Sequence, residues 1–157
     1  MKKVFVFLLL LGNLAYSQQE LSNVILKNLN SENVTITELN EPGKLYVYAF
    51  WATWCAPCIQ ELDAISDVYE DWKKELNVEV IAVSVDDART VKRVKPLVNG
   101  KGWEYNVLLD TNQDLKRKLS IANVPYLMVV KDNKIIFKQN GHSPGGENEL
   151  LTKLKTF

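Results

Sequence analysis

The 157-residue sequence has only two cysteines and one histidine, and its 19 basic side chains are balanced by 19 acidic ones. A zinc site needs about four ligands, so these few soft or imidazole groups argue against one within a single chain. No run of like charge stands out as a nucleic-acid contact. The basic stretch 89–95 is balanced by Asp86 and Asp87 before it, and the basic residues 116–118 are not accompanied by a second basic cluster. We therefore expect no metal, no cofactor and no nucleic-acid partner.

Long hydrophobic runs are also lacking. The apolar stretch near the start, residues 4–16, has 13 residues and includes Asn13, whereas a spanning helix needs about 20 apolar residues. It follows Lys2 and Lys3 and leads to small residues up to Ser17, an order typical of a secretory signal. We expect cleavage after Ser17, export to the periplasm or the cell exterior, and no stable membrane insertion afterwards; an uncleaved anchor is the alternative.

Removal of the signal leaves 140 residues, with 17 basic side chains against 19 acidic ones because Lys2 and Lys3 are lost. That length suits one hydrophobic core, and no repeat or linker divides the chain. We expect a single domain over residues 18–157.

Hydrophobic periodicity predicts strands that alternate with helices, which indicates an α/β sheet with helices on both faces. The strands at 45–51 and 78–85 are almost entirely apolar, as expected for central, parallel strands. The expected strands are 24–29, 34–39, 45–51, 78–85, 105–109, 126–130 and 134–138, and the expected helices are about 57–76, 88–98, 111–119 and 147–155.

Both cysteines, Cys55 and Cys58, lie between the strand 45–51 and the helix that follows it. A helix start carries partial positive charge and favours the thiolate of the first cysteine. A structural disulfide across so short a loop would remove little entropy from the unfolded chain, and a domain of this size needs none. The position therefore favours reversible thiol–disulfide chemistry.

The motif Phe50-Trp51-Ala52-x-Trp54-Cys55-x-Pro57-Cys58 resembles the active site of thioredoxin-fold proteins, and Val124-Pro125 matches their cis-proline element. The similarity covers about residues 22–157 and is greatest to the exported TlpA/ResA-like branch of thiol–disulfide oxidoreductases. It implies a thioredoxin-like fold with a central mixed sheet, an N-terminal β-hairpin and an extra helix and strand at about 88–109.

The position of the cysteines suggests that Cys55 is the exposed, attacking thiol and that Cys58 resolves the mixed disulfide. The buried acid of thioredoxins is absent, because Ala49 occupies its place, but Glu61 matches the acid of the ResA-like branch and would carry the proton of Cys58.

The resemblance also implies partner contacts at Val124 and Pro125, beside a cis peptide bond, and Trp54 is expected to form an apolar rim. His142 is expected to be a plain surface histidine, with a contact at the rim as the alternative. The expected partners are a protein disulfide or dithiol and an upstream electron donor.

The residues between the cysteines favour a reductase over a strong oxidant, because no histidine stands there to stabilise the thiolate further. Haem attachment is excluded because Ile59 replaces the required histidine. Two alternatives stay open: a redox-inert interaction module, and a thiol oxidase or peroxidase variant of the same fold, although residues 49–53 lack the proline typical of peroxiredoxins.

Overall fold

The computed structural model describes residues 19–157, so the expected signal peptide lies outside the described residues. Seven strands form one sheet in the order β2-β1-β5-β4-β3-β6-β7. The strands are β1 Ile25–Asn28, β2 Asn33–Thr35, β3 Leu45–Trp51, β4 Val78–Ser84, β5 Asn106–Leu109, β6 Tyr126–Lys131 and β7 Lys134–Asn140. The helices are α1 Ala56–Leu76, α2 Val94–Lys101, α3 Asp114–Lys118 and α4 Gly146–Leu154, with short 3-10 turns η1 Ile36–Glu38 and η2 Val91–Arg93.

The centre of the sheet is the parallel pair β3 and β4, as the two apolar runs predicted. All seven residues of β3 are buried, and β4 is buried except for Glu79. Strands with both faces covered show such continuous hydrophobic sequence because neither face meets water. β5 extends the parallel part, whereas β1 and β6 run antiparallel to their central neighbours.

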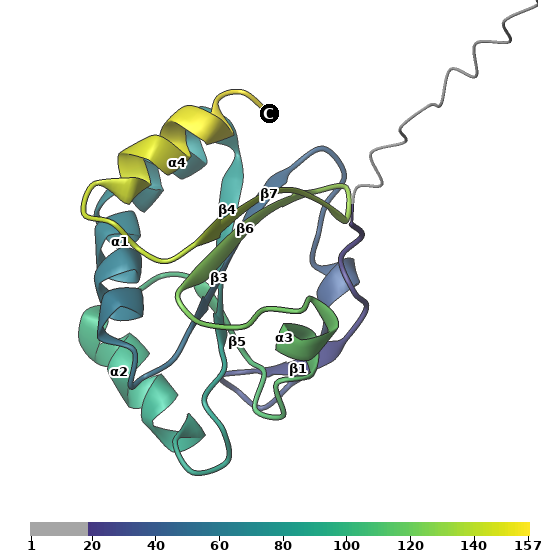
Figure 1. Ribbon diagram of the computed structural model, residues 1–157, viewed down its shortest axis with the longest axis vertical. Coiled ribbons are helices and arrows are strands. Elements are labelled where there is room, and N and C mark those ends of the chain that lie inside the picture. The colour runs from purple at the N-terminus through teal and green to yellow at the C-terminus, as the bar shows by residue number, and fades with distance from the viewer. Residues whose placement is uncertain (1–18) are drawn as a thin grey trace, which may run out of the picture.

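Helices cover both faces of this sheet. α1, α2 and α4 lie on one side, and α3 and η1 lie on the other (Figure 1). The apolar stripe of α1 packs inward, with Leu62, Ile65, Tyr69 and Trp72 buried. The predicted fold class, the N-terminal hairpin β1–β2 and the extra α2–β5 segment are all confirmed.

Two predicted elements differ from their expected boundaries by four residues or more at one end. The strand expected at 34–39 ends at Thr35, because the chain turns into η1 and buries Ile36 completely, with the Ile36 amide bonded to the Val24 carbonyl. The helix expected at 88–98 begins only at Val94, after a turn in which the Asp87 carbonyl accepts from two amides.

Pro96 does not end α2, which continues to Lys101. It lies in the first turn of the helix, where its missing N–H has no partner to lose.

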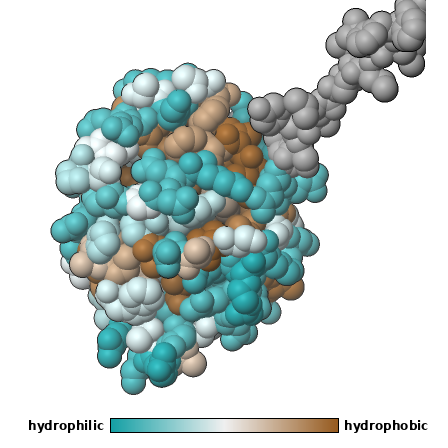
Figure 2. Space-filling view, in the orientation of Figure 1, coloured by the Kyte–Doolittle hydropathy of each residue, from teal (hydrophilic) through white to brown (hydrophobic). Residues whose placement is uncertain are grey.

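The surface is mostly polar. Figure 2 shows hydrophilic residues over most of one face, with smaller hydrophobic areas among them. Ile25, Trp54 and Phe157 are the large hydrophobic side chains exposed among residues 19–157. In the same range, no helix is both long and apolar enough to cross a membrane.

Candidate active site

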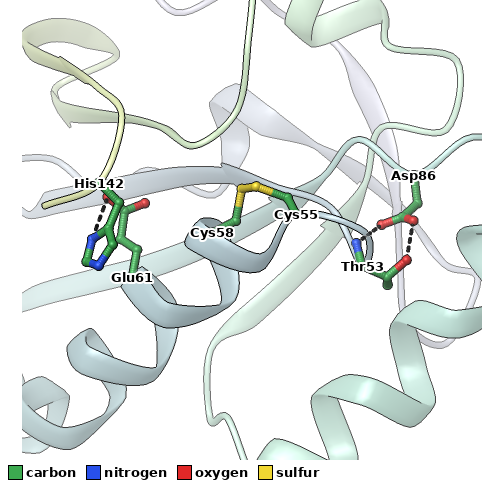
Figure 3. Close-up of a disulfide and its surroundings, with 6 residues drawn as sticks. All are labelled: Thr53, Cys55, Cys58, Glu61, Asp86 and His142. Carbon is green, nitrogen blue, oxygen red and sulfur yellow. Dashed lines mark hydrogen bonds and ion pairs between the residues drawn. A yellow bond between two sulfur atoms is a disulfide. The ribbon is translucent and has the colours of Figure 1, made fainter. Parts of the chain in front are cut away.

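Cys55 and Cys58 form a disulfide at the start of α1, with their Cα atoms 5.3 Å apart (Figure 3). Cys55 is the N-cap residue, Pro57 lies in the first turn, and Cys58 is the third helical residue. β3 delivers the chain to this point, and a bond from the Cys55 amide to the Ala52 carbonyl tightens the turn between strand and helix. Proline fits there because the first amides of a helix have no partner within it.

The two sulfurs differ in access, but less than the sequence suggested. Cys58 is fully buried, and Cys55 is only 5% exposed rather than an open thiol. Cys55, the more exposed of the two cysteines, is also the one expected to attack the partner first. A partner disulfide must therefore approach Cys55 closely to reach its sulfur.

Glu61 lies one helical turn beyond Cys58 and is buried, as its predicted role requires. Its burial raises the pKa of the carboxyl group from 4.5 to about 7, because a carboxylate loses favourable hydration inside the protein. A group with a pKa near neutrality can both take up and release a proton at physiological pH.

His142 is not the plain surface histidine that the sequence suggested. Its side chain is 9% exposed, and its Nδ1 lies 4.0 Å from Oε1 of Glu61. The expectation failed because the loop after β7 places His142, 81 positions from Glu61 in the chain, beside the first turns of α1 (Figure 3). The only sequence signal was the glycine before the histidine, which permits a turn at that point with φ of 77°.

Asp86 is a second residue whose place was missed. It is fully buried and accepts hydrogen bonds from the Thr53 amide, the Thr53 hydroxyl and the Ser84 hydroxyl at 2.6–2.9 Å. It thereby ties the loop before Cys55 to the end of β4 (Figure 3). Asp87 instead caps the turn that follows, where its side chain accepts a hydrogen bond from the Arg89 amide.

The remaining predicted site residues directly precede Cys55 or β6 in the chain. Trp54, directly before Cys55, is 61% exposed. The Val124–Pro125 peptide bond is cis, as the resemblance implied, and Pro125 is buried while Val124 is partly exposed. Trp51 belongs to the core and packs edge-to-face on Trp103 at 5.2 Å. Residues 19–157 hold no cluster of three or more His, Cys, Asp or Glu suited to a metal ion.

Comparison with known proteins identifies the family. The model of the AhpC/TSA family matches residues 18–141. The chain belongs to the AhpC/TSA family. Within that family it is 29% identical over 119 residues to the thiol-disulfide oxidoreductase ResA of Bacillus thuringiensis (strain Al Hakam), across 75% of this chain and 66% of that relative.

Two solved structures support the thioredoxin-like fold of this AhpC/TSA member. An uncharacterized thioredoxin-like protein from Porphyromonas gingivalis is 42% identical, with a TM-score of 0.77 over 87% of this chain and 90% of that one. A putative thiol:disulfide interchange protein DsbE from Chlorobium tepidum is 18% identical, with a TM-score of 0.76 over 88% and 95%. The resemblance to the ResA-like branch that the motifs suggested is thus confirmed.

The role of Asp86 can be tested by Asp86→Ala. The substitution leaves two hydroxyls and one amide without their acceptor in the interior, so the free energy of unfolding should fall by about 3 kcal/mol in urea denaturation. Asp87→Ala is the matched control, since Asp87 caps a turn at the surface and pairs with the exposed Arg89, so its loss should cost clearly less stability than the loss of the buried Asp86. Equal losses in the two variants would show that the buried carboxylate does not hold the loop.

The raised pKa of Glu61 should make stability depend on pH. Between about 4.5 and 7 the folded state keeps a proton that the unfolded state has lost, so stability falls as pH rises through this range and levels off above 7. Glu61→Gln removes this dependence, and the oxidised variant should be more stable than the oxidised parent at pH 8 by up to about 3 kcal/mol.

The measurement is urea unfolding of both oxidised proteins at several pH values. Taking the difference between them cancels the titration of the other groups that the two proteins share. A difference that stays constant between pH 4 and pH 8 would contradict the raised pKa.

Proposed function

We propose that this protein is an exported thiol–disulfide oxidoreductase that reduces protein disulfides. The observation that carries the proposal is the Cys55–Cys58 pair at the start of α1, with the buried Glu61 one turn behind it. The similarity to ResA supports the reaction class, since that relative is named a thiol-disulfide oxidoreductase.

In the proposed reaction, the Cys55 thiolate attacks one sulfur of a partner disulfide and the partner's other sulfur leaves as a thiolate. Cys58 then attacks the Cys55 sulfur of the mixed disulfide, which releases the second partner sulfur and forms the Cys55–Cys58 bond. Two electrons pass from the dithiol to the partner. Glu61 takes the proton of the Cys58 thiol, so that a thiolate is available for the second attack.

The surroundings of the cysteines support this division of roles. Partial positive charge at the start of α1 stabilises a thiolate on Cys55, the N-cap residue. Cys58 is sealed from solvent and reacts only with a sulfur already bound at Cys55. Trp54 offers an apolar contact for the partner, and we assign Val124 and Pro125 to the same binding surface.

Export and direction belong to the same proposal. The basic start and short apolar stretch of residues 1–17 support a cleaved signal and a mature domain over residues 18–157 in the periplasm or outside the cell. An upstream electron donor is then needed there to reduce Cys55–Cys58 again. Ala56 and Pro57 between the cysteines support reduction rather than oxidation of the partner.

The order of attack can be tested with Cys58→Ala. Without the resolving thiol, the mixed disulfide cannot be released, so Cys55 should retain a partner that reducing agent frees on a non-reducing gel. Cys55→Ala is the matched control and should retain nothing. Capture by Cys58 in the control, and none by Cys55, would reverse the assignment.

The direction can be tested by measuring the reduction potential of the Cys55–Cys58 couple in a thiol redox buffer. A reductase should have a potential near that of thioredoxin, about −270 mV, and the dithiol form should reduce insulin. A potential near −120 mV would instead indicate an oxidant. Failure of the wild-type protein to reduce insulin, together with turnover of hydrogen peroxide, would favour the peroxidase alternative.

A further inference from the structure

The proposed reaction leaves one requirement open, and the following inference rests on that reaction. Glu61 receives a proton in each cycle and has to lose it before the next one. Its side chain is 7% exposed, and this burial favours the protonated form of the carboxyl group. A positive charge beside Glu61 would offset that effect, because it stabilises the carboxylate.

His142 lies at that position. The loop that carries His142 begins directly after β7 at Gly141, which has a positive φ. The Gly141 amide donates a hydrogen bond to the Pro125 carbonyl at 2.9 Å. This bond fixes the loop against the start of β6 and holds the imidazole 4.0 Å from the Glu61 carboxyl group. In Figure 3 a dashed line joins one Glu61 oxygen to His142, and both of these side chains lie on the same side of the disulfide.

Glu61 and His142 share a small cavity between α1, β6, β7 and the start of α4. Its volume of about 10 Å³ is close to the smallest that holds one water molecule. A separation of 4.0 Å is too long for a direct hydrogen bond but close enough for an ion pair, with room for about one bridging water.

The groups that face Glu61 differ in their charge. α4 contributes Glu147 to the cavity wall, and one buried oxygen of this carboxylate has no hydrogen-bond partner among the described residues. β7 contributes the uncharged Gln139, and β6 contributes the apolar Leu127. His142 is therefore the one cavity-lining group in residues 19–157 that can carry positive charge beside Glu61.

We propose that His142 is a positioning residue that keeps Glu61 ready as a base, by placing a positively charged imidazolium beside its carboxylate. The proton leaves the Cys58 sulfur for a Glu61 oxygen, and it returns from Glu61 to water before the next cycle. The imidazolium favours this return because it stabilises the carboxylate form of Glu61. No electron moves in this transfer.

The test uses His142→Gln, which keeps a polar side chain but cannot carry the positive charge. The pKa of Glu61, followed by carboxyl-carbon NMR in the oxidised protein, should rise by about one unit because the nearby positive charge is lost. From a starting value of about 7, that rise lowers the carboxylate fraction at pH 7 about fivefold and leaves it almost unchanged at pH 9.

The rate of attack by Cys58 can be measured with dithiobis(nitrobenzoate) and the reduced protein. This reagent releases one coloured thiolate when Cys55 attacks and a second when Cys58 attacks. The second release should slow about fivefold at pH 7 in His142→Gln and recover at pH 9. The first release should stay unchanged and serves as an internal control of folding. His142→Ala should give the same profile.

Two controls separate this role from a structural one. Ser143→Ala, at the exposed neighbouring position, should change neither release. In a Glu61→Gln background, His142→Gln should add no further effect, because the histidine acts through Glu61.

An unchanged Glu61 pKa, or a second release slowed equally at pH 7 and pH 9, would overturn the proposal for His142. Neither result depends on insulin reduction, so failure of the proposed function is observed separately, as wild-type protein that does not reduce insulin.

Discussion

The parallel pairing of β3 with β4 is the constraint on which the site depends. Register places Trp51 opposite Ser84, and the Val85 amide donates to the Trp51 carbonyl at 2.8 Å. Both strands therefore end at the same edge of the sheet, where one continues into the cysteine loop and the other into Asp86. A slip of one residue would exchange the side chains between the two covered faces and shift these two loops apart.

Sequence alone predicted those parts of the fold whose signals are local. The continuous apolar runs identified β3 and β4, and the helical spacing of Leu62, Ile65 and Trp72 identified α1 with its inward face. The sequence could identify Cys55, Cys58 and Glu61 because each lies three positions after the one before, at the start of a single helix. Element boundaries failed where a turn residue such as Asp87 delayed a helix, because capping geometry competes with helix propensity over only a few residues.

The rest of the site is built by contacts between distant parts of the chain. His142 is 81 positions from Glu61, and Asp86 is 33 from Thr53. A lone histidine after a glycine is found on many protein surfaces, and an aspartate after a strand is often a helix cap. The residue types alone therefore do not indicate the roles of His142 and Asp86. Their positions follow only when the hairpin β6–β7 and strand β4 are in place.

The near-complete burial of the disulfide has a consequence for selectivity. With Cys55 5% exposed and Cys58 fully buried, little of the reactive cysteine pair is open to dissolved thiols and disulfides. In the proposed reaction, a macromolecule that docks on the exposed Trp54 brings its own disulfide close to Cys55 and holds it there, which raises its effective concentration. Fit to this surface then contributes, beside the difference in reduction potential, to the choice of the disulfide that reacts.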